Sequence, residues 1–198
     1  MSNLDILWSR FVETYGRDGA AALLGNIRAE SAYNPKNLQN SYEKKLGFTD
    51  DTYTAAVDSG AYSRDKFAHD SAGYGLCQWT HYSRKQNLYD YAKSHNSSIG
   101  DINMQAAFCI FEIEAYKLTD TLRSNISLRD KVAAVLRKYE KPADQSEANV
   151  DRRTKYAQDV LNAYPVGAVT PSTNYSAIAS ELKDIASRLN SIAYQLEK

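Results

Sequence analysis

Glu30 stands where a carboxyl group could act as a general acid. It follows Leu23 and Ile27 by seven and three residues, so a helix through this segment places all three on one apolar face. The helix must stop at Asn34-Pro35, which puts Glu30 in its last turn. Burial and the negative end of the helix dipole both favour the protonated carboxyl group. A carboxylic acid that keeps its proton near neutral pH can protonate a leaving oxygen.

Position alone leaves a structural role open for Glu30, which could cap a loop or pair with Arg28 or Arg84. Three motifs favour catalysis. They are GNIRAES at residues 25–31 followed by Asn34-Pro35, GYGLCQWT at residues 73–80, and YEKP at residues 139–142. In this order they resemble the motifs of the phage tail lysozyme family, over residues 1–164. The resemblance implies a lysozyme-like fold, attack on the sugar strands of bacterial cell walls, and Glu30 as the general acid.

A second carboxylate is harder to assign from the sequence. Glycoside hydrolysis usually needs a partner that activates water or stabilises the cationic sugar. The segment 36–72 offers Asp50, Asp51, Asp58, Asp65 and Asp70. Asp70 is preferred, because it is placed similarly to an aspartate before the glycine-aromatic-glycine-leucine turn of goose-type lysozymes, where it could face Glu30 across a groove. The alternatives are a turn-stabilising Asp70, another of these aspartates, or no partner.

The resembling motifs also contain candidates for substrate binding. Gln78 is expected to position the reacting sugar or to order the cleft backbone. Tyr74 and Trp79 could stack on sugar faces, although Trp79 could equally be a core residue under the cleft. The hydroxyl group of Tyr139 could bond the substrate or Glu30, but Tyr139 also falls on the apolar face of its own helix, which favours core packing.

The elements that must position these groups are mostly helical. Apolar residues recur at three- and four-residue spacing from residue 4 to Gly16, from 18 to 33, and in four further segments beginning near 83, 101, 127 and 146. The candidate N-caps are Asp18, Asp101, Ser127 and Ser146. Glu112 and Glu114 flank Ile113 on one helix and are interpreted as solvated. Segment 36–72 has no sustained period, so the prediction is a mostly α, α+β lysozyme-like domain with a small irregular or β segment.

Composition excludes several other classes of protein. The 198 residues carry 24 basic and 24 acidic side chains, so no strong field favours nucleic acid or a membrane surface. There is no run of 18 apolar residues and no signal segment at the N-terminus. Cys77 and Cys109 are predicted to be buried free thiols rather than a disulfide. Neither cysteine nor histidine spacing indicates a metal site, and no cofactor is implied.

Beyond the predicted domain, residues 165–174 are rich in proline and small residues and indicate a linker. Residues 175–198 then carry a heptad seam. It consists of Ile178, Leu182, Ile185, Leu189, Ile192 and Leu196. Leucine at a with isoleucine at d disfavours a parallel dimer, and Ala179, Ala186 and Ala193 at e widen the apolar stripe. The sequence therefore predicts a coiled-coil helix that forms a homo-oligomer, with a tetramer favoured; the alternative is that it folds back on its own domain.

These observations favour an endolysin that hydrolyses the β-1,4 bond between N-acetylmuramic acid and N-acetylglucosamine in peptidoglycan. Such an enzyme would be made in the cytoplasm of the bacterial host and released to the wall at lysis. Two alternatives stay open: a lytic transglycosylase, which needs one acid and leaves an anhydro sugar, and a non-catalytic wall-binding module with a lysozyme fold.

Overall fold

A computed structural model describes residues 1–166 of the chain, and the predicted coiled-coil segment lies outside these residues. The described part is mostly helical, as predicted. Its elements are α1 (Asn3–Ser31), α2 (Asn40–Leu46), α3 (Asp50–Asp58), α4 (Arg64–His69), α5 (Tyr82–Ser94), α6 (Ile102–Ala115), α7 (Thr119–Arg123), α8 (Leu128–Val135), the π-helical turn η1 (Leu136–Glu140) and α9 (Glu147–Ala163). None of the helices described is long and apolar enough to cross a membrane.

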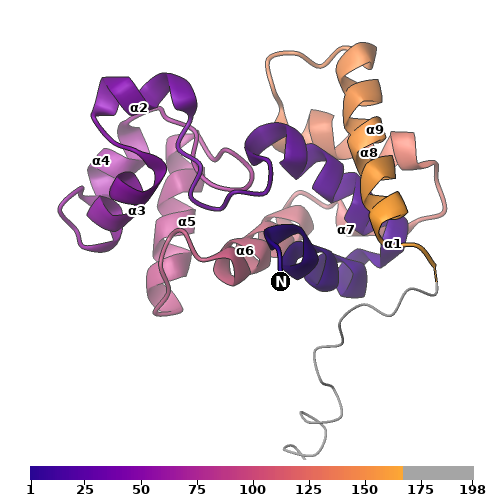
Figure 1. The fold of residues 1–198 in the computed structure, drawn as a ribbon, viewed down its shortest axis with the longest axis horizontal. Coiled ribbons are helices and arrows are strands. Elements are labelled where there is room, and N and C mark those ends of the chain that lie inside the picture. The colour runs from indigo at the N-terminus through magenta and orange to yellow at the C-terminus, as the bar shows by residue number, and fades with distance from the viewer. Residues whose placement is uncertain (167–198) are drawn as a thin grey trace, which may run out of the picture. The chain divides into compact units, whose positions relative to one another are not determined.

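Helix α1 runs through the larger group of helices and carries Glu30 at its end. It begins with a capping box between Ser2 and Asp5, and Gly16 interrupts it with a φ of 72°, a backbone conformation that glycine adopts without strain. The helix packs mainly on α9, α8 and α7 (Figure 1). A Cβ atom at Gly25 would lie 2.6 Å from the carbonyl oxygen of Arg153, so α1 and α9 cross at a distance that only glycine allows.

The segment between α1 and α5 forms short helices. Helices α2, α3 and α4 gather at one end of the molecule, with α5 and α6 between them and the α1–α9 group (Figure 1). This region was expected to be irregular or β, and the β alternative does not hold: within residues 1–166 only two isolated bridges occur, and both involve Tyr74. The reason is packing, since aromatic side chains from α3, α4, the loops beside them and the following turn form one cluster. It consists of Phe48, Tyr53, Tyr62, Phe67 and Tyr74.

The later helices begin where their caps were predicted. The side chains of Asp101, Ser127 and Ser146 accept hydrogen bonds from backbone N–H groups three residues further on, at 2.8, 3.1 and 3.3 Å. Helix α8 continues directly into the wider turn η1, in which the N–H of Lys141 donates to the carbonyl of Leu136 at 2.8 Å. Such π turns are rare and often lie at functional sites.

Candidate active site

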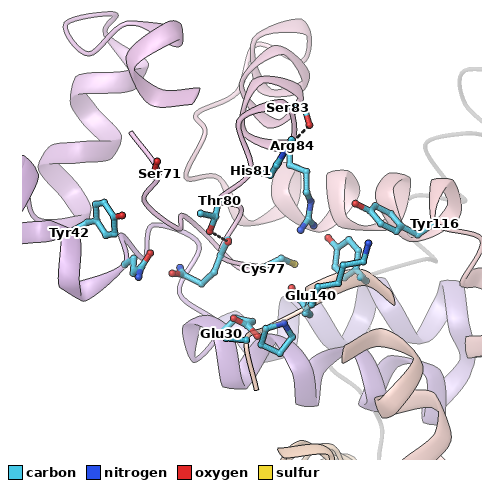
Figure 2. A pocket seen from close by; sticks show the side chains of 16 residues that line it. Glu30, Tyr42, Ser71, Cys77, Thr80, His81, Ser83, Arg84, Tyr116 and Glu140 are labelled. Carbon is cyan, nitrogen blue, oxygen red and sulfur yellow. Dashed lines mark hydrogen bonds between the residues drawn. The ribbon is translucent and has the colours of Figure 1, made fainter. Parts of the chain in front are cut away.

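A cleft of about 900 Å³ opens at the end of α1. Its walls come from five parts of the chain: the end of α1, the segment around α2, the turn before α5 with the start of α5, the end of α6, and η1 with the residues that follow (Figure 2). The lining residues are Glu30, Gln39, Tyr42, Ser71, Cys77, Gln78, Thr80, His81, Ser83, Arg84, Tyr116, Tyr139, Glu140, Lys141, Pro142 and Ala143. All three motifs found in the sequence therefore contribute to one cavity.

Glu30 lies in the last turn of α1 and borders this cleft, but its surroundings are not purely apolar. Its Oε1 atom lies 2.6 Å from Nη2 of Arg153, and the two side chains are only 17% and 4% exposed. Arg153 is held in turn by the amide oxygens of Asn26 and Asn149, at 3.2 and 3.3 Å. A buried guanidinium stabilises the ionised carboxylate. Glu30 therefore has a cationic neighbour that the sequence did not indicate, in addition to the apolar face and the helix end.

The two arginines considered as partners for Glu30 have other carboxylates. Arg28 forms an ion pair with Asp159 at 2.9 Å on the surface of the α1–α9 pair. Arg84 lines the cleft and binds Glu112 through two hydrogen bonds of 3.0 and 2.7 Å. Neither arginine therefore takes the place that Arg153 occupies beside Glu30.

Glu112 is the centre of a polar cluster under the cleft, which contradicts its interpretation as a solvated residue. It is 5% exposed and accepts hydrogen bonds from Arg84, from the indole N–H of Trp79 at 2.7 Å, and from the hydroxyl of Tyr139 at 2.8 Å. These donors offset the cost of burying the carboxylate. Trp79 is thus a core residue, whereas Tyr139, although buried, borders the cleft. Glu114 is exposed, as predicted.

Asp70 does not face Glu30 across the cleft, so its expected position is wrong. Its side chain is 3% exposed and forms an ion pair of 2.5 Å with the fully buried Lys85. The hydroxyl groups of Tyr53 and Tyr62 also donate to it, and the N–H of Ala72 donates to it at 2.9 Å. Every one of these contacts lies in the core or the adjacent turn, which fits the turn-stabilising alternative.

The other four aspartates that were considered also lie away from the cleft lining. Asp50 caps the loop after α1 by accepting from the N–H of Leu38 at 2.8 Å, and Asp58 accepts from the N–H of Ile99 at 2.9 Å. Asp51 and Asp65 are largely exposed and pair with Lys36 and His69. No aspartate of the segment 36–72 therefore stands opposite Glu30.

Of the two remaining candidates for sugar binding, the structure brings only Gln78 to the cleft. Its backbone has a φ of 43°, and its amide donates to the carbonyls of Asn37 and Gly75 at 3.1 and 3.2 Å, so it also orders the cleft backbone. Tyr74 is fully buried, and its hydroxyl lies 2.7 Å from that of Thr54. The ring of Tyr74 consequently supports the turn from behind and has no face free for a sugar.

The sequence model of the phage tail lysozyme family matches residues 2–164, which include every residue of the cleft lining. The chain belongs to the phage tail lysozyme family. Membership supports a lysozyme-type glycosidase that acts on peptidoglycan. A search of curated proteins found no significant match.

Glu140 is the functional candidate that sequence reasoning missed in this phage tail lysozyme. It ends η1, borders the cleft, and has an Oε1 atom that is buried without a hydrogen-bond partner among the described residues. Burial, then the neighbouring Cys77 and Glu30, raise the pKa of Glu140 well above its usual value against the opposing charges of Arg84 and Arg153. The available signal was its place in the YEKP motif, which had been used only as a mark of the family.

The two cysteines of this phage tail lysozyme lie next to one another beneath the cleft. Both are buried free thiols, with their Sγ atoms 3.8 Å apart, and burial raises the pKa of Cys77 well above its ordinary value. A protonated thiol is a poor nucleophile.

Within residues 1–166 no group of three or more histidine, cysteine, aspartate or glutamate side chains could hold a metal ion.

Proposed function

We propose that this phage tail lysozyme hydrolyses the β-1,4 bond between N-acetylmuramic acid and N-acetylglucosamine, with Glu30 as an essential carboxyl group. The observation that carries the proposal is the position of Glu30, at the end of a helix and on the wall of a cleft of about 900 Å³. A cavity of this size is in the range of sites that bind several rings of a ligand. Aromatic and amide groups beside it, from Tyr42, Tyr116 and Gln78, suit sugar faces and hydroxyl groups.

The ion pair of Glu30 with Arg153 bears on its role in the reaction. A general acid must be protonated before it reacts, whereas the guanidinium of Arg153 at 2.6 Å favours the ionised carboxylate. An ionised carboxylate beside the scissile bond stabilises positive charge on the sugar or activates water. The assignment of Glu30 as the acid, which came from its helix position and from the family resemblance, stays a prediction.

The test is digestion of purified peptidoglycan followed by mass analysis of the new glycan ends. A hydrolase adds one water at each cut, whereas a lytic transglycosylase leaves an anhydro sugar that is lighter by one water. We expect hydrolysed ends from the wild-type chain, and a loss of at least about two orders of magnitude in rate for Glu30→Gln, the usual scale for a carboxyl group in proton transfer.

The matched control is Glu114→Gln, the same change at an exposed glutamate of α6, and it should retain the wild-type rate. A wild-type chain that binds walls without releasing new ends would favour the wall-binding alternative. A Glu30→Gln variant that clears walls at the control rate would remove Glu30 from the reaction. The choice of an endolysin over an enzyme of the tail tip stays a prediction.

A further inference from the structure

In the described part of the chain the cleft lining contains one arginine and one lysine, and both lie near the same aromatic ring. The Cζ atom of Arg84 is 5.9 Å from the ring centroid of Tyr116, and the Nζ atom of Lys141 is 5.5 Å from it. Figure 2 shows Tyr116 and Tyr42 at opposite sides of the cavity. A lysine also lies over Tyr42, but this residue, Lys45, is outside the lining. The arginine and lysine charges of the lining are therefore concentrated at the Tyr116 end.

The two cations differ in how far their charge is compensated. Arg84 donates to Glu112 through Nε and Nη2, at 3.0 and 2.7 Å, so a carboxylate already balances it. Lys141 is exposed and forms no ion pair with any carboxylate of residues 1–166, and its neighbour Glu140 does not pair with it either. Lys141 thus brings to the cleft an ammonium group whose counter-charge is missing from the described residues.

The backbone of Lys141 is held in place at the cleft edge. Its N–H donates to the carbonyl of Leu136 at 2.8 Å, and its φ is 50°. The next residue, Pro142, has a fixed φ and also lines the cleft. The ring under the ammonium is fixed too, because Tyr116 packs edge-on against the buried Tyr139 with centroids 5.5 Å apart. A positioned cation loses less conformational freedom when a ligand binds.

The chemistry of this end suits an anion rather than a sugar ring. The hydroxyl and N-acetyl groups of a glycan strand are neutral, and they need no ammonium group to bind them. In peptidoglycan the lactyl substituent of N-acetylmuramic acid carries a short peptide, the stem, which has free carboxylates. Such a carboxylate would supply the counter-charge that Lys141 lacks, and the face of Tyr116 could contact the carbon atoms of the peptide.

We propose that the Tyr116 end of the cleft binds a carboxylate of the peptide stem, with Lys141 as the main contact and Arg84 as a second source of positive charge. The inference rests on the proposed function, because it names the part of the same substrate that this end recognises. Lys141 takes no part in the cleavage of the glycosidic bond. It makes the enzyme prefer glycan strands that carry anionic stems over strands whose stems are neutral or absent.

The kinetic test uses three soluble forms of the glycan strand. The first has native stems, the second has stem carboxylates converted to neutral amides, and the third has lost its stems to an amidase. Lys141→Gln should raise KM on native strands about fivefold, the scale of one charge pair at about 4 Å in water. Its kcat should change little, because the contact is the same before and during the reaction. On the other two substrates the variant should match wild type.

The matched control is Lys138→Gln, the same change at an exposed lysine of η1 that lies outside the lining. It should behave as wild type on all three substrates. Equal KM values for Lys141→Gln and Lys138→Gln on native strands would overturn the proposal. So would an equal loss on amidated or stem-free strands, since the bound group would then not be a stem carboxylate. Either result leaves the proposed function intact as long as new glycan ends appear.

Binding without cleavage provides a second measurement. In a Glu30→Gln background, Lys141→Gln should weaken binding to native strands by the same factor and leave binding to amidated strands unchanged. At about 1 M salt, where the screening length is about 3 Å, the difference should disappear. The wild-type chain alone gives a third result, because it should prefer native over amidated strands at low salt only. A wild-type chain without this preference would refute the proposal, whereas one that releases no glycan ends would refute the proposed function.

Discussion

Arg84 and Lys85 are neighbours on α5, and each forms an ion pair with a buried carboxylate, yet only one pair borders the cleft. The Arg84 side chain is 15% exposed and lines the cavity beside its partner Glu112, whereas Lys85 is fully buried with Asp70. Successive residues of a helix point about 100° apart. Helix α5 therefore supplies one cation, Arg84, to the cleft wall and a second cation, Lys85, to the core. Two adjacent cationic residues therefore have different surroundings because they differ by one position along the helix.

The two clusters resemble each other closely in composition. In each, a carboxylate is bound by a cation and by a tyrosine hydroxyl, from Tyr139 at Glu112 and from Tyr53 at Asp70. The difference is that the cleft opens on to the first cluster only. A buried charged cluster is thus a poor guide to a catalytic site until its exposed side is known. Asp70 was preferred for its place before the turn at residues 73–76, and a position in the sequence does not report whether the cleft reaches the side chain.

The largest effect should come from Asp70→Asn, which leaves the fully buried Lys85 without its counter-charge. Breaking a buried ion pair by removing one partner costs about 3–5 kcal/mol of unfolding free energy. Denaturant unfolding measures the loss. Because Asp70 lies away from the cleft, the folded molecules of the variant should digest peptidoglycan at a rate per molecule within a few-fold of wild type. A stable variant with a large loss in rate would instead return Asp70 to the candidate site.

Arg84→Lys should have a smaller effect on stability but a clear one on activity. Lysine keeps the charge and loses the two-pronged contact with Glu112, which should cost about 1.5–3 kcal/mol, the range for a hydrogen bond to a charged group. Because Arg84 borders the cavity, the rate on peptidoglycan should also fall. Unfolding and lytic rate are measured on the same preparation. An unchanged rate would mean that the first cluster is as remote from the chemistry as the second.

The smallest effects should come from a matched pair of changes, Tyr139→Phe and Tyr53→Phe. Each removes one hydroxyl donor from a carboxylate that retains other donors, so each should cost about 1 kcal/mol in unfolding free energy. Only Tyr139 borders the cleft, so only Tyr139→Phe should alter the kinetics. Equal kinetics for both variants would show that the cleft wall does not depend on this hydroxyl.

Local features were predictable from the sequence, whereas pairings between distant segments were not. The caps at Asp101, Ser127 and Ser146 and the break at Gly16 depend on a few neighbouring residues, and all are confirmed. The position of Glu30 in the last turn of its helix was likewise correct.

What escaped prediction was the set of partners. Arg153 reaches Glu30 from α9, and three donors from separate elements converge on Glu112. Helical periodicity reports which face is buried but not which charged group from another helix meets it. The position of Glu140 was equally hidden, because nothing in the spacing of Val132, Val135 and Tyr139 indicated a π turn at the end of their helix.

That π turn has a consequence for which side chains line the cleft. A π turn contains one residue more than the α turn it replaces, and Glu140 is the residue at which it ends. Deleting a single residue between Leu136 and Tyr139 would restore a regular helix and rotate the following side chain away from the cleft. The position of Glu140 at the cleft therefore depends on the number of residues in this turn as well as on their identity. A protein of this fold can keep every motif and still lose the group through one deleted codon.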